Sequence, residues 1–441
     1  MVRVDKKLPF VAFICLIYLV QNYVKIGTKE VFTNSSSSPA LPSVPRAEYD
    51  SHSVRETKRK RNSTKTITPS TDISLQSWID GDLSPWVKTG ITKKMVDLAA
   101  QQGLRANRIQ IIDGNLYALV SKSSRGPSRI WYWLWGLREL LDEFPQEIPN
   151  ADFVLNTQDD PQVAILGKRP KNPLSAKKFR DYVPGREDSA PPPVFSAVKT
   201  TNNYDLLWPL WTIWGEDVEG ASKKTGGFHD APWKLLHPQL VRRAKENEWI
   251  DREGQKIFWR GSVKTNPLRR DLIRCSKKLV DAADVQHKLR RGKPIGALDR
   301  VKHKYLIYLD GKSFSSAVLP MLVSGSILLL PRNSPFQTLC QRAFRAKDFQ
   351  IEFETSRVHG EFCRNISNIA LDLQKNTDKT EKLAKESILW AEAHLSMDAF
   401  QQYMIAMLQR YSNLLKYTPS RTKYAQEVSW KLIKKNVKRR R

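Results

Sequence analysis

The strongest alternation of apolar and polar segments lies in residues 304–331. An apolar run at 305–309 ends at the turn pair Asp310-Gly311, and a hydroxyl-rich segment follows before the apolar stretch 318–323. Residues 327–330 are again apolar. This order predicts a buried strand, a turn, a helix and a second buried strand, which together make a βαβ unit.

The turn inside this unit is a candidate phosphate-binding loop. Ligands of open α/β sheets bind at the carboxyl ends of strands, where backbone N–H groups and hydroxyls can hold phosphate oxygens. The same pattern also fits a structural crossover that binds nothing, so the residues leave both interpretations open. The loop comprises Gly311, Lys312, Ser313, Phe314, Ser315 and Ser316.

Other periodic segments predict further strands and helices on both sides of this unit, as expected for an α/β fold. A hairpin is indicated by two apolar runs around the turn residues Asp113-Gly114-Asn115. The expected elements are this hairpin at 108–120, a helix at 130–141, strands at 151–156 and 257–260, a helix at 268–275 and one long terminal helix within 380–417.

The N-terminal 24 residues have a different pattern. Basic residues precede an apolar stretch at 8–20, and no charge follows until Lys25. A cleaved signal peptide and a short signal anchor both fit this pattern, and the lack of small residues after Val20 favours the anchor. Such an anchor would leave the basic end in the cytoplasm and the body in the lumen of the endoplasmic reticulum or Golgi.

Composition adds a strong positive charge. The chain has 73 Lys and Arg against 45 Asp and Glu, which gives a formal net charge of +28. This charge predicts attraction to nucleic acid, anionic membranes or phosphorylated substrates. The basic runs at 55–61 and 431–441 are also typical of solvated or membrane-facing segments. A secretory route would disfavour nucleic acid as a partner.

The cysteines and the absent motifs exclude several classes. None of the four cysteines forms a CxxC pair, so a zinc module is not expected. Cys275, Cys340 and Cys363 can form at most one disulfide, and the sequence leaves the pairing open. The chain lacks a P-loop, a GxSxG elbow, an HExxH helix and a GxGxxG turn.

Two groups of acidic residues are candidates for chemistry. Asp159 and Asp160 follow the strand expected at 151–156, where a carboxylate can accept a proton from a hydroxyl or can simply serve a turn or a helix cap. Asp80-Gly81-Asp82 has the DxD form that holds a metal in one class of sugar transferases. It lies in a turn-like context rather than at a strand end, so we do not expect a metal there.

Aromatic and basic residues supply further candidates. Rings can stack on sugar faces, although tryptophan at this density is also typical of a core. Arg269 and Arg270 can clamp a diphosphate or can be surface charge. The candidate aromatic residues are Tyr204, Trp208, Trp211 and Trp214.

Five segments in order resemble glycosyltransferase family 90, which groups lipopolysaccharide-modifying enzymes, protein O-glucosyltransferases and fungal capsule-type xylosyltransferases. The resemblance spans roughly residues 74–417. The segments are SWIDGDLSPWVKTGIT, FVLNTQDDPQV, VFSAVKTTNNYDLLWPLWTIWG, FWRGSVKTNPLRRDLIRC and HKYLIYLDGKSFSSAVLPMLVSGSILLL.

This resemblance implies a GT-B fold, in which two Rossmann-like domains enclose the donor in a cleft. It also implies an inverting reaction with a UDP-sugar as co-substrate, glucose or xylose as the sugar, and neither a metal nor a cofactor. Asp159 matches the catalytic base, and Trp211, Trp214 and the neighbouring Asp160 are candidates for the sugar or acceptor pocket. The matching donor-binding residues are Ser262, Arg269, Gly311, Lys312, Ser313, Phe314, Ser315 and Ser316.

One position departs from the resemblance. Protein O-glucosyltransferases of the family carry an Arg against the diphosphate where this chain has Ala317. Arg269, Arg270, Lys264 or a helix N-terminus could supply the missing positive charge.

The prediction is therefore a membrane-anchored α/β glycosyltransferase that acts on a protein or glycan. The alternative is a catalytically impaired family member that binds an acidic glycan or another polyanion. The predicted segments are a cytoplasmic tail at 1–7, a signal-anchor helix at 8–24, a disordered stem at 25–73, an N-terminal lobe with the base at 74–250, a C-terminal donor lobe with the terminal helix at 251–417 and a basic tail at 418–441.

Overall fold

The computed structural model describes residues 73–102, 106–121, 127–165, 185–186, 190–215, 233–285, 295–356 and 358–438. Residues 67–441 form one compact unit. The predicted cytoplasmic tail, the predicted anchor and the predicted stem up to residue 72 lie outside the described residues. Within the described ranges, no helix combines the length and the apolarity needed to cross a membrane.

A six-stranded mixed sheet contains the predicted hairpin. The two strands of this sheet that come first along the chain are antiparallel. They are joined at Asp113 and Gly114, whose φ angles of 50° and 74° suit a tight two-residue hairpin turn. The third and fourth strands run parallel. The strand order is β11 (Gln426–Glu427), β2 (Asn115–Leu119), β1 (Ala106–Ile112), β3 (Ala151–Asn156), β4 (Val194–Ser196) and β5 (Leu206–Leu207).

A five-stranded sheet contains the predicted βαβ unit, and all its neighbouring strands are parallel. The unit is confirmed as β8, the helix α9 (Val318–Leu322) and β9. Every residue of β9 is buried, which explains the unbroken apolar run there. The strand order is β10 (Gln350–Phe353), β9 (Ile327–Pro331), β8 (His303–Ile307), β6 (Glu253–Gly261) and β7 (Val280–Asp284).

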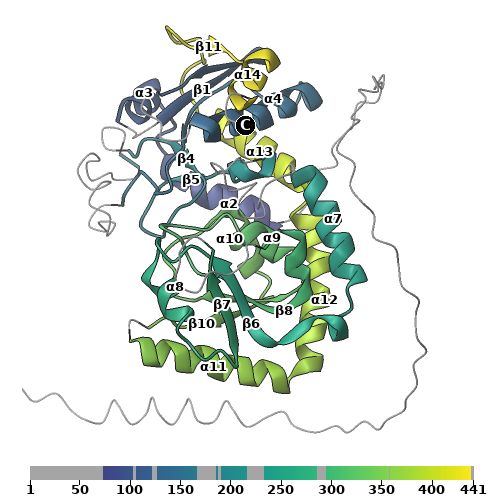
Figure 1. Cartoon of the computed structure of the whole chain (residues 1–441). Coiled ribbons are helices and arrows are strands. Elements are labelled where there is room, and N and C mark those ends of the chain that lie inside the picture. The colour runs from purple at the N-terminus through teal and green to yellow at the C-terminus, as the bar shows by residue number, and fades with distance from the viewer. Residues whose placement is uncertain are drawn as a thin grey trace, which may run out of the picture. The chain divides into compact units, whose positions relative to one another are not determined.

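Helices pack around both sheets. In Figure 1, α7 and α12 run side by side, and α11 lies along the five-stranded sheet. The helices are α2 (Ile73–Leu83), α3 (Lys93–Gln102), α4 (Pro127–Glu143), α7 (Trp233–Glu246), α8 (Pro267–Leu272), α10 (Leu339–Arg345), α11 (His359–Lys375), α12 (Thr377–His394), α13 (Met397–Asn413) and α14 (Trp430–Lys438).

The C-terminal region differs from the prediction in two ways. The expected single terminal helix is two helices, because α12 ends at His394 and Ser396 caps α13 by accepting a hydrogen bond from the Ala399 amide. The predicted basic tail is folded as far as residue 438, since β11 pairs with β2 and α14 packs on α4. Ile433 of α14 is fully buried, and Trp430 donates a hydrogen bond to Asp142.

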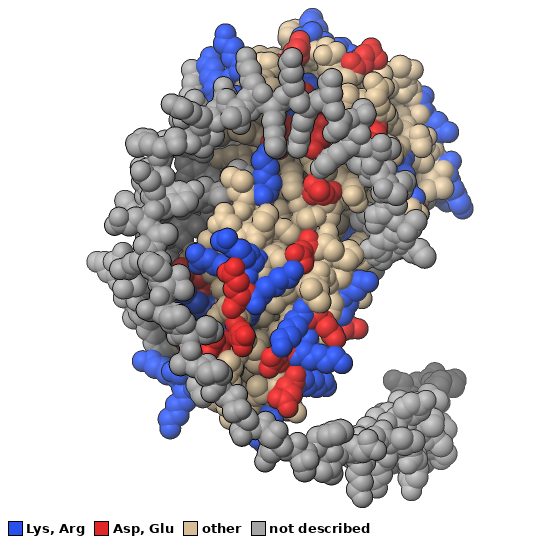
Figure 2. Space-filling view, turned by 90° about the vertical axis from the view of Figure 1, so that its right-hand side faces the viewer, with Lys and Arg blue, Asp and Glu red and all other residues tan. Residues whose placement is uncertain are grey.

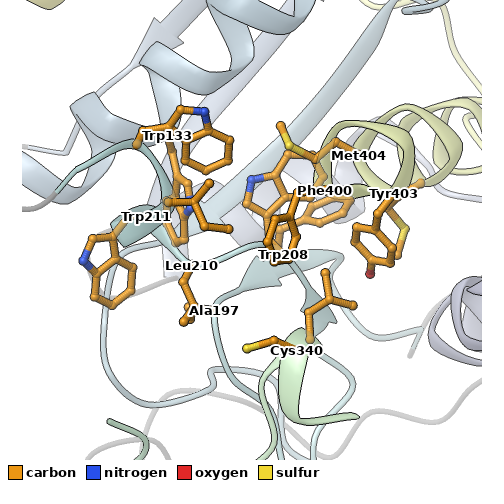
Figure 3. Packing of buried hydrophobic residues seen from close by; sticks show 14 of the residues in the cluster. Trp133, Ala197, Trp208, Leu210, Trp211, Cys340, Phe400, Tyr403 and Met404 are labelled. Atoms are coloured by element: carbon orange, nitrogen blue, oxygen red, sulfur yellow. The ribbon is translucent and has the colours of Figure 1, made fainter. Parts of the chain in front are cut away.

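Tryptophan side chains fill much of the core beside the six-stranded sheet. Figure 3 shows Trp208 among side chains of one buried cluster that includes Phe400 and Met404 of α13. Trp214 packs so closely over Gly136 of α4 that a Cβ at this glycine would lie 2.1 Å from the indole ring. The density of tryptophan at 194–215 therefore reflects core packing to a large extent.

One disulfide forms between two of the three candidate cysteines. Cys275, which follows α8, is bonded to Cys363 of α11 with a Cα–Cα distance of 5.3 Å. Cys340 is a buried free thiol, and burial raises its pKa to about 11. The disulfide fastens α11 to the part of the chain that follows β6.

Candidate functional site

Two loops that follow strands of different sheets meet at the candidate site. The loop after β3 carries Asp160, and the loop after β8 carries Lys312. Their side chains form an ion pair in which Lys312 Nζ lies 3.1 Å from Asp160 Oδ2. The loop that carries the predicted base and the predicted donor loop are therefore neighbours.

Asp159 is held by a cation that the sequence analysis did not identify. Arg129 of α4 lies 2.7 Å from Asp159 Oδ1 and also donates a hydrogen bond to the carbonyl of Thr157. The guanidinium stacks over the ring of Trp211 at 4.2 Å from the centroid. The Asp159 side chain remains 37% exposed, so it is open to solvent.

A buried network fixes the loop after β3. The side chain of Asn156, the last residue of that strand, donates to the carbonyl of Asp160 and accepts from the Gln158 amide. Below it, Asp205 accepts hydrogen bonds from the Ser196 hydroxyl and from two backbone amides. Burial raises the pKa of Asp205 to about 6. These hydrogen bonds thus hold the backbone that carries Asp159 and Asp160 in one defined conformation.

The loop after β8 has an equally defined shape. A Cβ at Gly311 would lie 2.7 Å from the carbonyl oxygen of Phe314, so the fold of the loop requires glycine there. The Tyr308 hydroxyl accepts a hydrogen bond from the Ser315 amide at 2.9 Å. Ser313 is buried, and its hydroxyl has no hydrogen-bond partner among the residues that the structure describes. This geometry suits a loop that holds oxygen atoms of a ligand.

Asp310 supports this loop from below. Its carboxylate accepts a hydrogen bond from the Ser334 hydroxyl at 2.6 Å. Burial is the largest influence on this group and raises the pKa of Asp310 to about 6. Burial and the adjacent carboxylate of Asp310 raise the pKa of Tyr308.

Arg269 joins the third loop, which follows β6, to the loop after β8. Its guanidinium donates to the carbonyl of Ser262 at 3.1 Å and to the carbonyl of Leu309 at 2.7 Å. It also bonds the hydroxyl of Thr265. Arg269 is only 6% exposed, and burial lowers its pKa. It therefore holds two loops in place, and its role as a clamp on diphosphate stays a prediction.

The predicted sugar-stacking rings are mostly enclosed. Trp208, Trp211 and Trp214 are at most 5% exposed. The face of Trp211 is covered by Arg129, and Phe314 of the donor loop packs edge-on against it at 5.7 Å. Trp211 thus links the two loops through packing and offers no open face for a sugar.

The DxD segment lies in α2, not in the turn-like context that the sequence suggested. Asp80 pairs with Arg410, and the buried Asp82 pairs with Lys199 and Arg342. These cations lower the pKa of Asp82 although burial alone would raise it. In the described part of the chain, no group of three or more His, Cys, Asp or Glu side chains is placed to hold a metal ion.

Comparisons with known proteins agree with the resemblance of the sequence segments. The model of glycosyl transferase family 90 matches residues 72–441. Protein O-glucosyltransferase 1 of Homo sapiens is 26% identical over 378 residues, which cover 81% of this chain and 84% of the relative. O-glucosyltransferase rumi of Drosophila melanogaster is 23% identical over 350 residues, which cover 76% of each chain.

The family match begins at the start of the described body and includes the C-terminal segment with β11 and α14. This extent agrees with the packing of α14 on α4, since the segment belongs to the folded body. With a match over more than half of its length, the chain belongs to glycosyl transferase family 90 and is a glycosyltransferase.

Proposed function

We propose that the protein transfers a sugar from a UDP-sugar to a hydroxyl group of a protein. The relatives named protein O-glucosyltransferase favour glucose as the sugar and a protein as the acceptor. Xylose is the second candidate, because the sequence segments also resemble capsule-type xylosyltransferases. The donor is a co-substrate, so the proposal includes no resident cofactor and no metal ion.

The ion pair between Asp160 and Lys312 is the observation that carries this proposal. It places the carboxylates after β3 next to the glycine-containing loop after β8. The two sheets would then be the two lobes of a GT-B fold, with the donor between their loops. Ligands of parallel sheets bind at such strand ends.

The proposed reaction is a single displacement. Asp159 accepts the proton of the acceptor hydroxyl, whose oxygen forms a bond to the anomeric carbon while the bond from that carbon to the diphosphate oxygen breaks. The diphosphate leaves with the bonding electron pair as UDP. Attack from the face opposite to the leaving group inverts the anomeric configuration. Backbone amides of the loop at 311–315 would stabilise the negative charge that develops on the diphosphate.

We extend the proposal to the secretory pathway. The bond between Cys275 and Cys363 supports an oxidising compartment, because disulfides rarely persist in the cytosol. The proposed location is the lumenal side of the endoplasmic reticulum or Golgi membrane, with residues 8–24 as a type II anchor.

The alternative of a polyanion-binding protein receives less support from the surface. On the face in Figure 2, basic and acidic side chains are interspersed rather than gathered into one basic field. Ion pairs along α7 and α12 include Lys245 with Glu392 and Lys385 with Glu381. Mixed charges of this kind lower the attraction to a polyanion.

A donor screen tests the proposed function. The purified full-length protein would be incubated with UDP-glucose, UDP-xylose, UDP-galactose and GDP-mannose, and the release of nucleotide would be measured with and without EDTA. We expect UDP release from UDP-glucose or UDP-xylose, undiminished by EDTA, with water as the acceptor in this assay. NMR spectra recorded before the free sugar equilibrates should show the inverted anomer. Release from GDP-mannose alone, or a retained configuration, would contradict the proposal.

A further inference from the structure

The charged side chains around the two loops differ in how firmly they are engaged. Arg269 is buried and donates to two carbonyls and a hydroxyl. Arg129 is engaged by Asp159, by a carbonyl and by the face of an indole ring. Arg342 shares the buried carboxylate of Asp82 with a lysine. Moving any of these cations toward a ligand would break several contacts at once.

Lys312 is engaged much less firmly. It lies on the candidate phosphate loop itself, its side chain is 56% exposed, and it pairs with Asp160 at 3.1 Å. An ion pair with an exposed lysine contributes little stability, commonly below about 1 kcal/mol. A ligand with more negative charge than one carboxylate can therefore compete with Asp160 for Lys312.

We propose that Lys312 is the cation that binds the diphosphate of the donor, and that it leaves Asp160 to do so. This inference rests on the proposed function, because it assumes a nucleoside diphosphate donor at this loop. In the unliganded protein Asp160 holds Lys312. In the complex Lys312 binds the diphosphate and neutralises part of the charge on the leaving group, where Ala317 supplies none.

The exchange has a consequence for the acceptor. The Asp160 side chain is only 17% exposed, so a carboxylate that has lost its cation would lack solvation. A hydrogen-bond donor from the acceptor would satisfy it. Asp160 stands next to Asp159, so the acceptor hydroxyl would be drawn to the base once the donor is in place. Donor binding would thereby precede and favour acceptor binding.

Calorimetric titration of the full-length protein with UDP and with uridine tests the exchange. Lys312→Met should weaken UDP binding about tenfold, the scale of one charge-assisted hydrogen bond, and should leave uridine binding unchanged. Asp160→Asn should strengthen UDP binding, because the competing carboxylate is gone. The double variant should bind UDP as Lys312→Met does, since Asp160 acts only through Lys312.

Lys302→Met is the matched control. Lys302 precedes the same strand at its other end, is 59% exposed and pairs with Asp299 at 2.7 Å. Its replacement should change neither titration. Lys312→Arg, which keeps the charge, should retain most of the UDP affinity.

Three results would overturn the inference. The first is an unchanged UDP affinity of Lys312→Met, and the second is a weakening of uridine binding in this variant equal to that of UDP binding. The third is a loss of UDP affinity in Asp160→Asn as large as in Lys312→Met, which would mean that the ion pair only holds the loop. These results require that the wild-type protein binds UDP. If it binds neither UDP nor uridine, the proposed donor itself is wrong, and the two failures remain distinguishable.

Discussion

Arg129 pairs with the proposed base Asp159, and the sequence did not predict this contact. The two aspartates were predicted as candidates because they follow a strand, and this inference needs only local pattern. Arg129 is 30 residues away from Asp159 and lies on the first turns of α4, just outside the helix expected at 130–141. Its role depends on the contact between the start of α4 and the loop after β3, and no local pattern carries that information.

Replacing Arg129 tests whether it positions the proposed base. Arg129→Gln should lower kcat about ten- to a hundredfold and change the KM for the donor much less, because a misplaced carboxylate slows proton transfer more than it weakens donor binding. Arg129→Lys should recover part of the rate. Steady-state kinetics with the active UDP-sugar measure both constants.

Arg138→Gln is the control, since Arg138 is on the same helix and pairs with Asp142. A similar loss of rate in both variants would indicate that general damage to α4, rather than the position of Asp159, causes the effect.

Asp310 gives the candidate site a predictable pH dependence of stability. Its pKa is raised from 3.8 to about 6 in the folded protein, so the folded state holds this proton more tightly than the unfolded state. The resulting stabilisation is complete below about pH 4 and is lost as the pH rises through about 6. Asp310→Asn removes this titration.

Denaturant unfolding of the wild type and Asp310→Asn between pH 4 and pH 7 measures the effect. The free energy of unfolding of the wild type should fall relative to that of the variant as the pH rises across this range. A difference between the two proteins that does not change with pH would show that Asp310 has an ordinary pKa.

At the scale of elements, short-range patterns predicted the strands and turns of the site. The strand at 151–156 and the βαβ unit at β8 and β9 were recovered because apolar runs are bounded there by polar or glycine residues. The helix α2 was missed because Gly81 and two aspartates suggested a turn. Its Asp82 is held by Lys199 and Arg342, which are 117 and 260 residues away in sequence.

The C-terminal helix was missed for a different reason. Ile433 and Val437 of α14 are four residues apart and face the body, but the surrounding basic residues gave the segment the composition of a solvated tail. Charge on the outer face of a helix is compatible with an apolar inner face. The average composition of such a segment therefore conceals the positions that pack.

The bond between Cys275 and Cys363 closes a loop of 88 residues that contains four of the five parallel strands, β7 to β10. Cys275→Ser together with Cys363→Ser should lower the free energy of unfolding by about 2 to 4 kcal/mol, because the unfolded chain gains freedom. Denaturant unfolding measures this loss, and a reductant should reproduce it in the wild type. The Cys340→Ala variant should lose as much stability in the reductant as the wild type does, because Cys340 is not part of the disulfide. Equal stability of the wild type and the double variant would contradict this role.

At the scale of the whole body, the site exists because segments far apart in sequence are fastened together. Asp82 of α2 binds Lys199, which follows β4, and Arg342 of α10. The backbones of Lys199 and Gln337 also exchange two hydrogen bonds. These contacts join the segment that follows β4 of the six-stranded sheet to the segment that follows β9 of the five-stranded sheet. The resemblance of five ordered segments predicted such a meeting of loops, whereas no single segment did.

The central claim is that Asp159 serves as the base beside a UDP-sugar held by the loop after β8, and Asp159→Asn tests it most directly. We predict that turnover of the active UDP-sugar falls about 10²- to 10⁴-fold while UDP binds as in the wild type. Asp80→Asn, which removes another arginine-paired carboxylate, should keep the wild-type rate. A turnover of Asp159→Asn equal to that of the wild type would contradict the account.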